Sequence, residues 1–269
     1  GSHYNANSLG IAYIASYLNK RGHDAWLYNA DYVSDKNYGN LKKLFQNFTN
    51  YKNYFKDLNN PLWHEVKDKI LSFKPEWVGY TSYTANISAI KIISEKVRQA
   101  NPHIKQVIGG VHATLDKKIL NELKNIDYSI QREGEEAMTA LVENKNPKTI
   151  PGVILRGKES LIDNGIAPVI KDIDNLPMPE RDKFWAIPNS ERKNVDVSYI
   201  NTIRGCPYKC TYCASPFHWD RKTTRLRSPE SVIEEMKHLK EKYWQATKYD
   251  YSASANISEK DSLKIEDNT

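Results

Sequence analysis

The chain has 269 residues and a formal net charge of +6 at pH 7, and 39% of its residues are apolar and 27% are charged, as is usual for a globular protein. No apolar run approaches the length that a membrane-spanning helix needs, and we see no signal-peptide pattern in the first residues. The basic residues are scattered along the chain, which disfavours a nucleic-acid-binding face. The densest basic run, 221–227, is interpreted as a solvated loop or a site for a small anion.

Alternating helices and short strands are predicted over the first half of the chain. Apolar residues at helical spacing predict helices at about 9–21, 62–73, 85–99, 117–123 and 135–143. Short apolar runs predict strands at 24–30, 76–82, 106–110 and the start of 128–136. Residues 35–60 follow no clear period and are read as a loop with some helix. This alternation predicts βαβ units and a parallel sheet.

Ligands of parallel sheets bind at the loops beyond the carboxyl ends of the strands. In this chain those loops are predicted at 81–84, 109–114 and 132–135, and all three are polar or rich in glycine. The agreement between the three loops makes that edge of the sheet the predicted ligand site of the first half.

The second half changes character. Prolines punctuate residues 147–194, which predicts a linker between domains. A strand is predicted at 196–202, and a helix is predicted to open at Ser228 and Pro229. Its expected buried stripe consists of Val232, Ile233, Met236, Leu239 and Tyr243.

All three cysteines of the chain, Cys206, Cys210 and Cys213, lie in one short loop. They are too close together for a disulfide framework, and thiolates at short spacing select soft metals. One alternative is a structural zinc site completed by His218. The other is an iron–sulfur cluster, in which three protein ligands leave one iron open to a cofactor or a substrate.

The spacing C-x₃-C-x₂-C, with Tyr212 just before the last cysteine in "TIRGCPYKCTYCASP", resembles the radical S-adenosylmethionine (SAM) enzymes. Upstream, "LGIAYIASYLNKRGHD", "KPEWVGYTSYT", "VIGGVHAT", "REGEEA" and "DIDNLPMPERD" resemble, in that order, the members with an N-terminal cobalamin (B12)-binding domain. The resemblance covers nearly the whole chain.

The resemblance implies an α/β fold. A Rossmann-like parallel sheet of the cobalamin-binding type is expected over 1–147, without its first strand, followed by a linker over 148–194. Residues 195–269 are expected to form the start of a radical SAM βα (partial TIM) barrel. The chain is expected to be a fragment truncated at both ends.

The resemblance also assigns cofactors to residues. Cys206, Cys210 and Cys213 would hold a [4Fe–4S] cluster whose open iron chelates SAM, and Tyr212, Glu266 and Asp267 would contact SAM. The residues implied to line cobalamin are Ser82, Thr84, Gly109, Gly110, His112, Gly134 and Glu135. Ordinary turns of a parallel sheet are the alternative interpretation of this second set.

The implied function is that of a cobalamin-dependent radical SAM enzyme, most often a methyltransferase. The alternatives are radical SAM cyclisation or rearrangement, and an inactive module that only binds cobalamin or the cluster. A small-molecule or peptide substrate, an electron donor such as flavodoxin or ferredoxin, and an anaerobic or well-reduced cytoplasm are expected. Catalytic side chains and the substrate are not indicated by the sequence.

Overall fold

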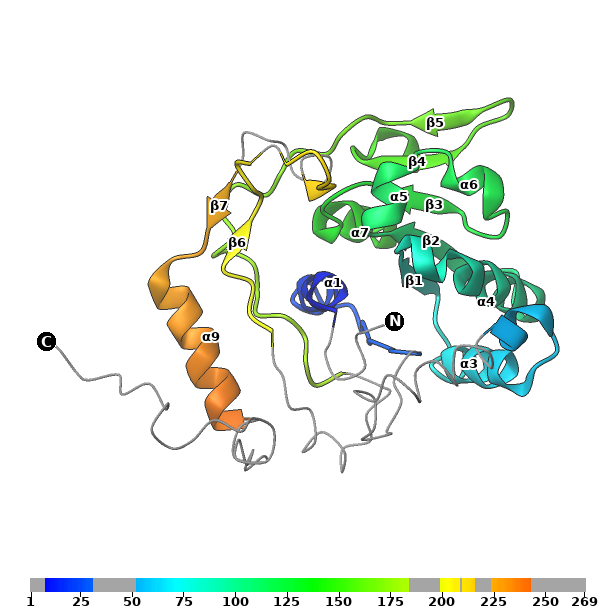
Figure 1. The fold of residues 1–269 in the computed structure, drawn as a ribbon, viewed down its shortest axis with the longest axis horizontal. Coiled ribbons are helices and arrows are strands. Elements are labelled where there is room, and N and C mark those ends of the chain that lie inside the picture. Colours follow the sequence, from blue (N-terminus) through cyan, green and yellow to red (C-terminus); the bar gives the residue numbers. More distant parts are fainter. Residues whose placement is uncertain (1–7, 31–51, 184–198, 209, 216–223, 243–269) are drawn as a thin grey trace, which may run out of the picture.

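The computed structural model describes residues 8–30, 52–183, 199–208, 210–215 and 224–242 (Figure 1). Its centre is a five-stranded sheet with the order β1-β2-β3-β4-β5. The strands are β1 (Trp77–Thr81), β2 (Lys105–Gly109), β3 (Tyr128–Ile130), β4 (Val153–Arg156) and β5 (Leu161–Asp163). The first three strands run parallel, with Thr81 opposite Gly109, while β4 and β5 are antiparallel to their neighbours.

Helices connect and cover these strands. They are α1 (Leu9–Asn19), α3 (Pro61–Ser72), α4 (Ile87–Ala100), α5 (Val111–Leu115), α6 (Ile119–Glu122) and α7 (Glu135–Val142). Short 3₁₀ turns at Thr84–Asn86 and Pro147–Thr149 precede α4 and β4. Asn60 caps α3 by accepting a hydrogen bond from the Leu62 amide at 3.1 Å, and Pro61 occupies the first turn, where its missing amide hydrogen costs nothing.

Two apolar clusters fix the sheet between its helices. On one side, Ile87 and Ile90 of α4 pack with Ile108 of β2 and Ile119 and Leu120 of α6. On the other, Leu18 of α1 and Leu141 of α7 pack against Val107, Ile130 and Val153 of the strands. Neighbouring residues of one strand, such as Val107 and Ile108, thus serve opposite faces, as the two-residue period of a strand requires.

The predicted alternation of helices and strands is confirmed, with three differences. The sheet is mixed rather than purely parallel, because the hairpin β4–β5 joins it from within the expected linker. The strand predicted at 24–30 is reduced to one bridging residue, Leu27, whose amide donates to the Lys183 carbonyl at 2.8 Å. The helix predicted over 117–123 is the shorter α6, and α5 forms in a segment read as a loop.

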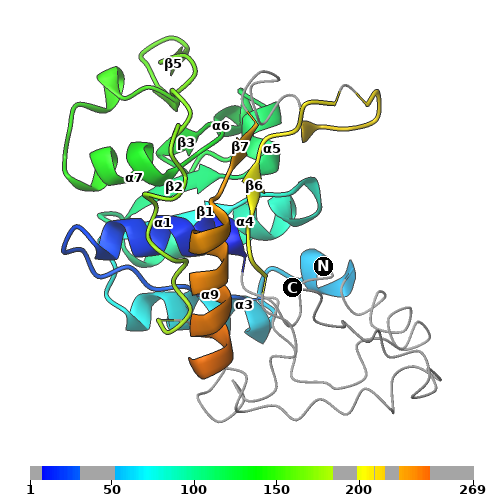
Figure 2. The ribbon, with the colours of Figure 1, turned by 90° about the vertical axis from the view of Figure 1, so that its left-hand side faces the viewer.

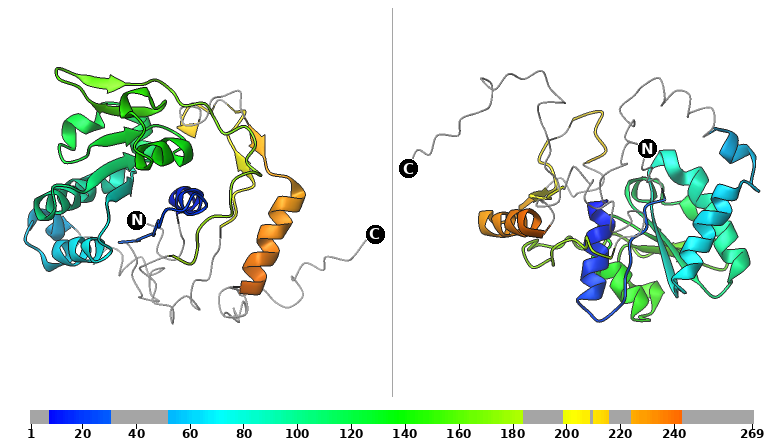
Figure 3. Two further views of the ribbon diagram at one scale, coloured as in Figure 1. Left: turned by 180° about the vertical axis from the view of Figure 1, so that it is seen from behind. Right: turned by 90° about the horizontal axis from the view of Figure 1, so that it is seen from below.

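The second part of the molecule is a ribbon of β6 (Ile203–Arg204) and β7 (Arg225–Leu226), followed by α9 (Pro229–Lys242). The strand predicted at 196–202 is found instead at 203–204, as β6. Residues 196–198 of that prediction lie outside the described part of the chain. Helix α1 lies between the sheet and the layer of β6, β7 and α9 (Figures 1 and 3). Figure 2 shows β6 and β7 side by side above α9.

The stripe predicted for α9 is partly wrong. Ile233 and Met236 are half exposed, whereas Leu239 and the charged Glu235 are buried. Glu235 is buried because it forms ion pairs with Arg181, at 2.5 Å, and with Arg227. Tyr243 and the strand-like end of the chain lie outside the described residues. In the part of the chain that the structure describes, no helix is long and apolar enough to cross a membrane.

Replacing Ile108 with alanine tests the core. Ile108 is fully buried in β2, so Ile108→Ala is expected to lower the free energy of unfolding by about 2–5 kcal/mol. The matched control is Ile166→Ala, because Ile166 is 56% exposed and loses little on truncation. Urea unfolding followed by circular dichroism measures both, and equal losses in the two variants would contradict this assignment of the core.

Candidate functional site

Ser82 joins two of the turns at the carboxyl edge of the sheet. It follows β1 directly and is fully buried. Its hydroxyl donates to the Gly109 carbonyl at 2.7 Å and accepts from the Ala113 amide at 3.1 Å. The Ser82 carbonyl accepts from the His112 amide at 3.0 Å. Within the structure the Ser82 side chain therefore stabilises the turns themselves.

Position 110 requires glycine because of its backbone conformation and the atoms that surround it. Its φ is +94° with ψ of −169°, a conformation that is essentially restricted to glycine. A Cβ at this position would lie 2.8 Å from the Ser82 amide nitrogen and 2.9 Å from the Ser82 carbonyl oxygen. The turns after β1 and β2 can approach this closely only without a side chain there.

The third turn, after β3, is bonded to the second. The Gln131 side-chain amide donates to the Ala113 carbonyl at 2.7 Å, and the Arg132 amide donates to the Thr114 hydroxyl at 2.9 Å. Arg132 has a φ of +64°, a left-handed conformation that non-glycine residues rarely adopt. The prediction that the three turns meet at one edge of the sheet is confirmed.

A cavity of about 790 Å³ opens beside this edge. Its walls come from α1, from residues 23–28, from β1 and from the turns after β2 and β3. Of the residues that the sequence assigned to cobalamin, four line the cavity: Gly109, Gly110, Gly134 and Glu135. Ser82, Thr84 and His112 lie outside it, although the Thr84 hydroxyl and His112 Nδ1 are 3.0 Å apart at the surface.

Gly134 is the N-cap residue of α7 and Glu135 is its first residue, and both are buried. A Cβ on Gly134 would lie 2.8 Å from Ile14 Cδ1, so this glycine lets α1 pack closely against the turn. The Glu135 carboxylate accepts from Arg204 Nη2 at 2.7 Å. Both residues thus have structural contacts in addition to their place in the cavity wall.

Glu133 is the centre of a buried ion-pair network that the sequence interpretation missed. Its carboxylate accepts from Arg204 Nη1 at 3.1 Å, from Arg225 Nη1 at 2.8 Å and from the Ile170 amide at 2.8 Å. Burial alone would lower the pKa of Arg204, but the charges of Glu135 and Glu133 outweigh it and raise that pKa. Arg204 therefore stays charged between its two carboxylates.

The network also changes the interpretation of the basic run 221–227. Arg225 pairs with Glu133, and Arg227 pairs with the buried Glu235. Both arginine side chains are more than nine-tenths buried, so they do not contribute to a basic surface. Residues 221–223 lie outside the described part of the chain.

The cysteine loop leaves β6 immediately after Arg204. Cys206 and Cys213 are partly buried, Cys210 is exposed, and all three are free thiols. The Ser215 amide donates to Cys213 Sγ at 3.4 Å. Among the described residues, no three Cys, His, Asp or Glu side chains converge as a set of metal ligands, so the structure does not bring the three thiols together.

Of the residues predicted to contact SAM, only Tyr212 lies in the part of the chain that the structure describes. Tyr212 lies in the cysteine loop with 91% of its surface exposed. Glu266 and Asp267 lie outside the described residues, as does His218 of the alternative zinc site.

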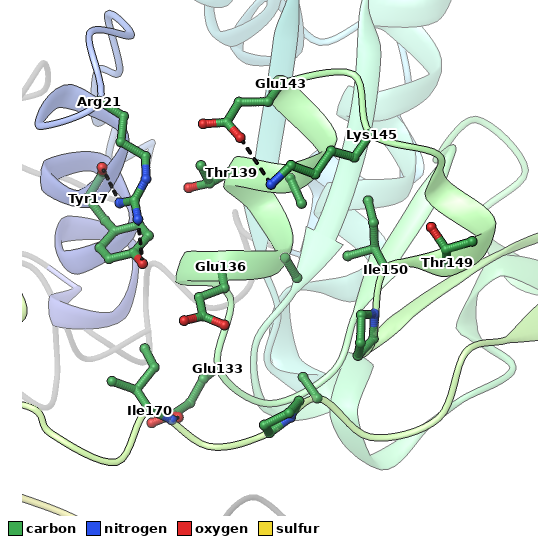
Figure 4. Close-up of a pocket in the computed structure, with 15 residues that line it drawn as sticks. Tyr17, Arg21, Glu133, Glu136, Thr139, Glu143, Lys145, Thr149, Ile150 and Ile170 are labelled. Carbon is green, nitrogen blue, oxygen red and sulfur yellow. Dashed lines mark hydrogen bonds and ion pairs between the residues drawn. The ribbon is translucent and has the colours of Figure 1, made fainter.

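A smaller cavity, of about 420 Å³, lies between α1, α7 and residues 149–151 and 167–170 (Figure 4). Two of its basic side chains have partners in the cavity wall: Arg21 donates to the Tyr17 hydroxyl at 2.8 Å, and Lys145 pairs with Glu143 at 3.4 Å. None of the residues that the sequence assigned to cobalamin lines this cavity, which makes the larger cavity the candidate ligand site.

Comparison with known families assigns both parts of the chain. The model of the B12 binding domain matches residues 2–142, more than half of the chain. The chain belongs to this family. The model of the radical SAM superfamily matches residues 200–249, which include the cysteine loop. The resemblance to radical SAM enzymes with an N-terminal B12-binding domain is therefore confirmed.

Known relatives of this B12-binding radical SAM chain have several activities. It is 27% identical to the anaerobic magnesium-protoporphyrin IX monomethyl ester cyclase of Cereibacter sphaeroides, over 75% of this chain and 34% of that protein. It is 21% identical to the cytidylyl-2-hydroxyethylphosphonate methyltransferase of Streptomyces wedmorensis, over 87% of this chain and 48% of that protein. The chain thus spans between a third and a half of the length of these relatives.

The fold is shared with a solved structure. The radical SAM methyltransferase TsrM from Kitasatospora setae, solved with tryptophan and a SAM analogue, superposes with a TM-score of 0.60 at 16% identity. The match covers 86% of this chain and 42% of TsrM. At this identity the comparison supports the α/β architecture of a B12-binding radical SAM protein.

Replacing Gly110 with alanine tests the turn geometry. Gly110→Ala places a methyl group against the Ser82 backbone at a glycine-only φ, and it is expected to lower the free energy of unfolding by about 1–3 kcal/mol. The control is Gly79→Ala, because a Cβ at Gly79 meets nothing within 4 Å. Thermal or urea unfolding measures both, and a Gly110→Ala variant as stable as the wild type would contradict the assigned geometry.

Proposed function

We propose that this chain is the cobalamin- and cluster-binding part of a cobalamin-dependent radical SAM methyltransferase. The observation that carries the proposal is the direct attachment of the cysteine loop to the ligand edge of a B12-binding sheet. Arg204, two residues before Cys206, is held by Glu133 and Glu135 of the turn after β3. A radical SAM loop and a B12-binding edge are thus neighbours in one structure.

The donor set suits an iron–sulfur cluster. Three thiols in one short loop, partly accessible and not oxidised to disulfides, are the ligands that such clusters use. When bound, a [4Fe–4S] cluster would supply one-electron reduction of SAM, and cobalamin would supply methyl-transfer chemistry. Cys206, Cys210 and Cys213 would hold the cluster, and the exposed Tyr212 would pack against the adenine of SAM.

The edge of the sheet suits a large ligand with a polar tail. Gly109 and Gly110 present backbone without side chains to the larger cavity, so a ligand can approach the main chain. The buried Ser82 hydroxyl fixes the distance between the turn after β1 and the turn after β2. The Thr84–His112 pair lies at the surface of the same turns, where its hydroxyl and imidazole would meet a polar group.

The partners follow from this assignment. A small-molecule or peptide substrate would complete the site, and an electron donor such as flavodoxin or ferredoxin would approach the exposed side of the loop at Tyr208 and Cys210. A reduced, anaerobic cytoplasm would protect such a cluster from oxygen.

Anaerobic reconstitution tests the cluster. The wild-type chain is expected to bind about four iron ions and to develop a broad absorbance band in the blue, and Cys210→Ala is expected to lose both. Tyr208→Phe is the control, because Tyr208 lies in the same loop and has no thiol. Tightly bound zinc in place of iron would contradict the proposal and favour the Cys₃His site.

A methyl label separates the two main activities. Transfer of a labelled methyl group from SAM to a product, dependent on added cobalamin, is the result expected for a methyltransferase. Release of 5′-deoxyadenosine without methyl transfer would favour the cyclase alternative, which the similarity to magnesium-protoporphyrin cyclases supports. Failure of the chain to bind cobalamin would contradict both the leading proposal and the assigned edge.

A further inference from the structure

The structure assigns Glu133 and Glu135 a role as positioning residues: through Arg204 they hold the cysteine loop at a fixed place beside the ligand edge of the B12-binding sheet. The inference rests on the proposed function, in that the loop is taken to carry the cluster. The contact itself is independent of that proposal and is given by the ion pairs of Arg204.

The geometry is that of a two-pronged clamp. Glu133 and Glu135 stand on either side of Gly134 and approach the two terminal nitrogens of one guanidinium, at 3.1 and 2.7 Å. A planar guanidinium with two donating nitrogens can bridge two carboxylates, whereas the point charge of an ammonium group cannot do so in the same way. Arg204 is therefore fixed in orientation as well as in distance.

Because the ion pairs of the clamp are buried, they favour one position of the cysteine loop over others. The side chains of Arg204, Glu133 and Glu135 are at least 94% buried, so water cannot replace a lost partner. Loss of one partner from a buried pair is far more disruptive than loss of an exposed pair, because it leaves the other charge buried without a counter-charge. The alternative positions of the loop are disfavoured because they would leave a buried charge without its counter-charge.

Further segments of the chain contact the residues of this clamp. Arg225 of β7 binds Glu133 from the second strand of the ribbon, and the Tyr13 ring of α1 lies 4.9 Å from the centre of the Arg204 guanidinium. The Arg225 Nη1 also donates to the Ile170 carbonyl at 2.6 Å. Strand β6 precedes the cysteine loop in the sequence and β7 follows it. Both strands are thus bonded to the turn after β3 of the sheet.

Conservative substitution on the full chain tests the clamp. Glu135→Gln keeps the size of the side chain and removes its charge, while Glu136→Gln is the matched control, since Glu136 is the exposed neighbour on the same helix. Two readouts are compared after anaerobic reconstitution: the rate of iron release to a ferrous chelator, and amide hydrogen exchange of residues 199–208.

Glu135→Gln is expected to speed both iron release and exchange over 199–208 by about tenfold or more, because the buried Arg204 loses one of its two counter-charges. Exchange in β1–β3 is expected to stay at the wild-type rate, which a general loss of stability would not allow. Glu136→Gln is expected to match the wild type. Wild-type rates in Glu135→Gln would overturn the inference, as would faster exchange across the whole sheet.

A second variant guards against failure of Glu135→Gln to fold. Arg204→Lys keeps the charge and loses the bridging geometry, so it is expected to show the same local effect to a smaller extent. Wild-type rates in this variant would also overturn the inference. If the wild type takes up no iron, the proposed function fails, and exchange over 199–208 in the iron-free chains still decides whether the clamp positions the loop.

Discussion

The buried pairing of Arg204 with Glu133 and Glu135 is the constraint on which the arrangement of the two parts depends. Transfer of each ion from water costs several kcal/mol, and only a close counter-charge offsets it. Four charges, including that of Arg225, balance one another in this interior. The ribbon cannot shift against the sheet without separating them, so the position of the cysteine loop is set by electrostatics and not only by the covalent chain.

The sheet edge that receives this ribbon is rigid for a different reason. The turns after β1, β2 and β3 are bonded to one another through Ser82, Thr114 and Gln131, and Gly110 allows their close approach. A ligand at this edge would therefore meet preformed backbone. The same turn after β3 that closes the edge also supplies the carboxylates that hold Arg204, which places the two candidate sites on one rigid element.

The elements of the first half could be predicted because each has a clear local period, as in the Ile87, Ile90 and Ile93 face of α4. The hairpin β4–β5 could not, because its short strands lie among prolines that indicate a linker. On α9 the apolar period predicted burial of Ile233 and Met236. The ion pairs of Glu235 instead favour burial of the helix face that carries Glu235 and Leu239. The motif "REGEE" drew attention to Glu135, yet nothing local could show that its partner lies 69 residues away.

The most direct measurement of the central claim is a double-mutant cycle between Glu135→Gln and Arg204→Gln, with the free energy of local opening of residues 199–208 measured by amide hydrogen exchange for the wild type, both single variants and the double variant. If the two residues form one buried ion pair, the loss in the double variant is smaller than the sum of the single losses, by about 0.5–3 kcal/mol. Losses that add to within about 0.3–0.5 kcal/mol would contradict the claim, since residues that add in this way do not interact.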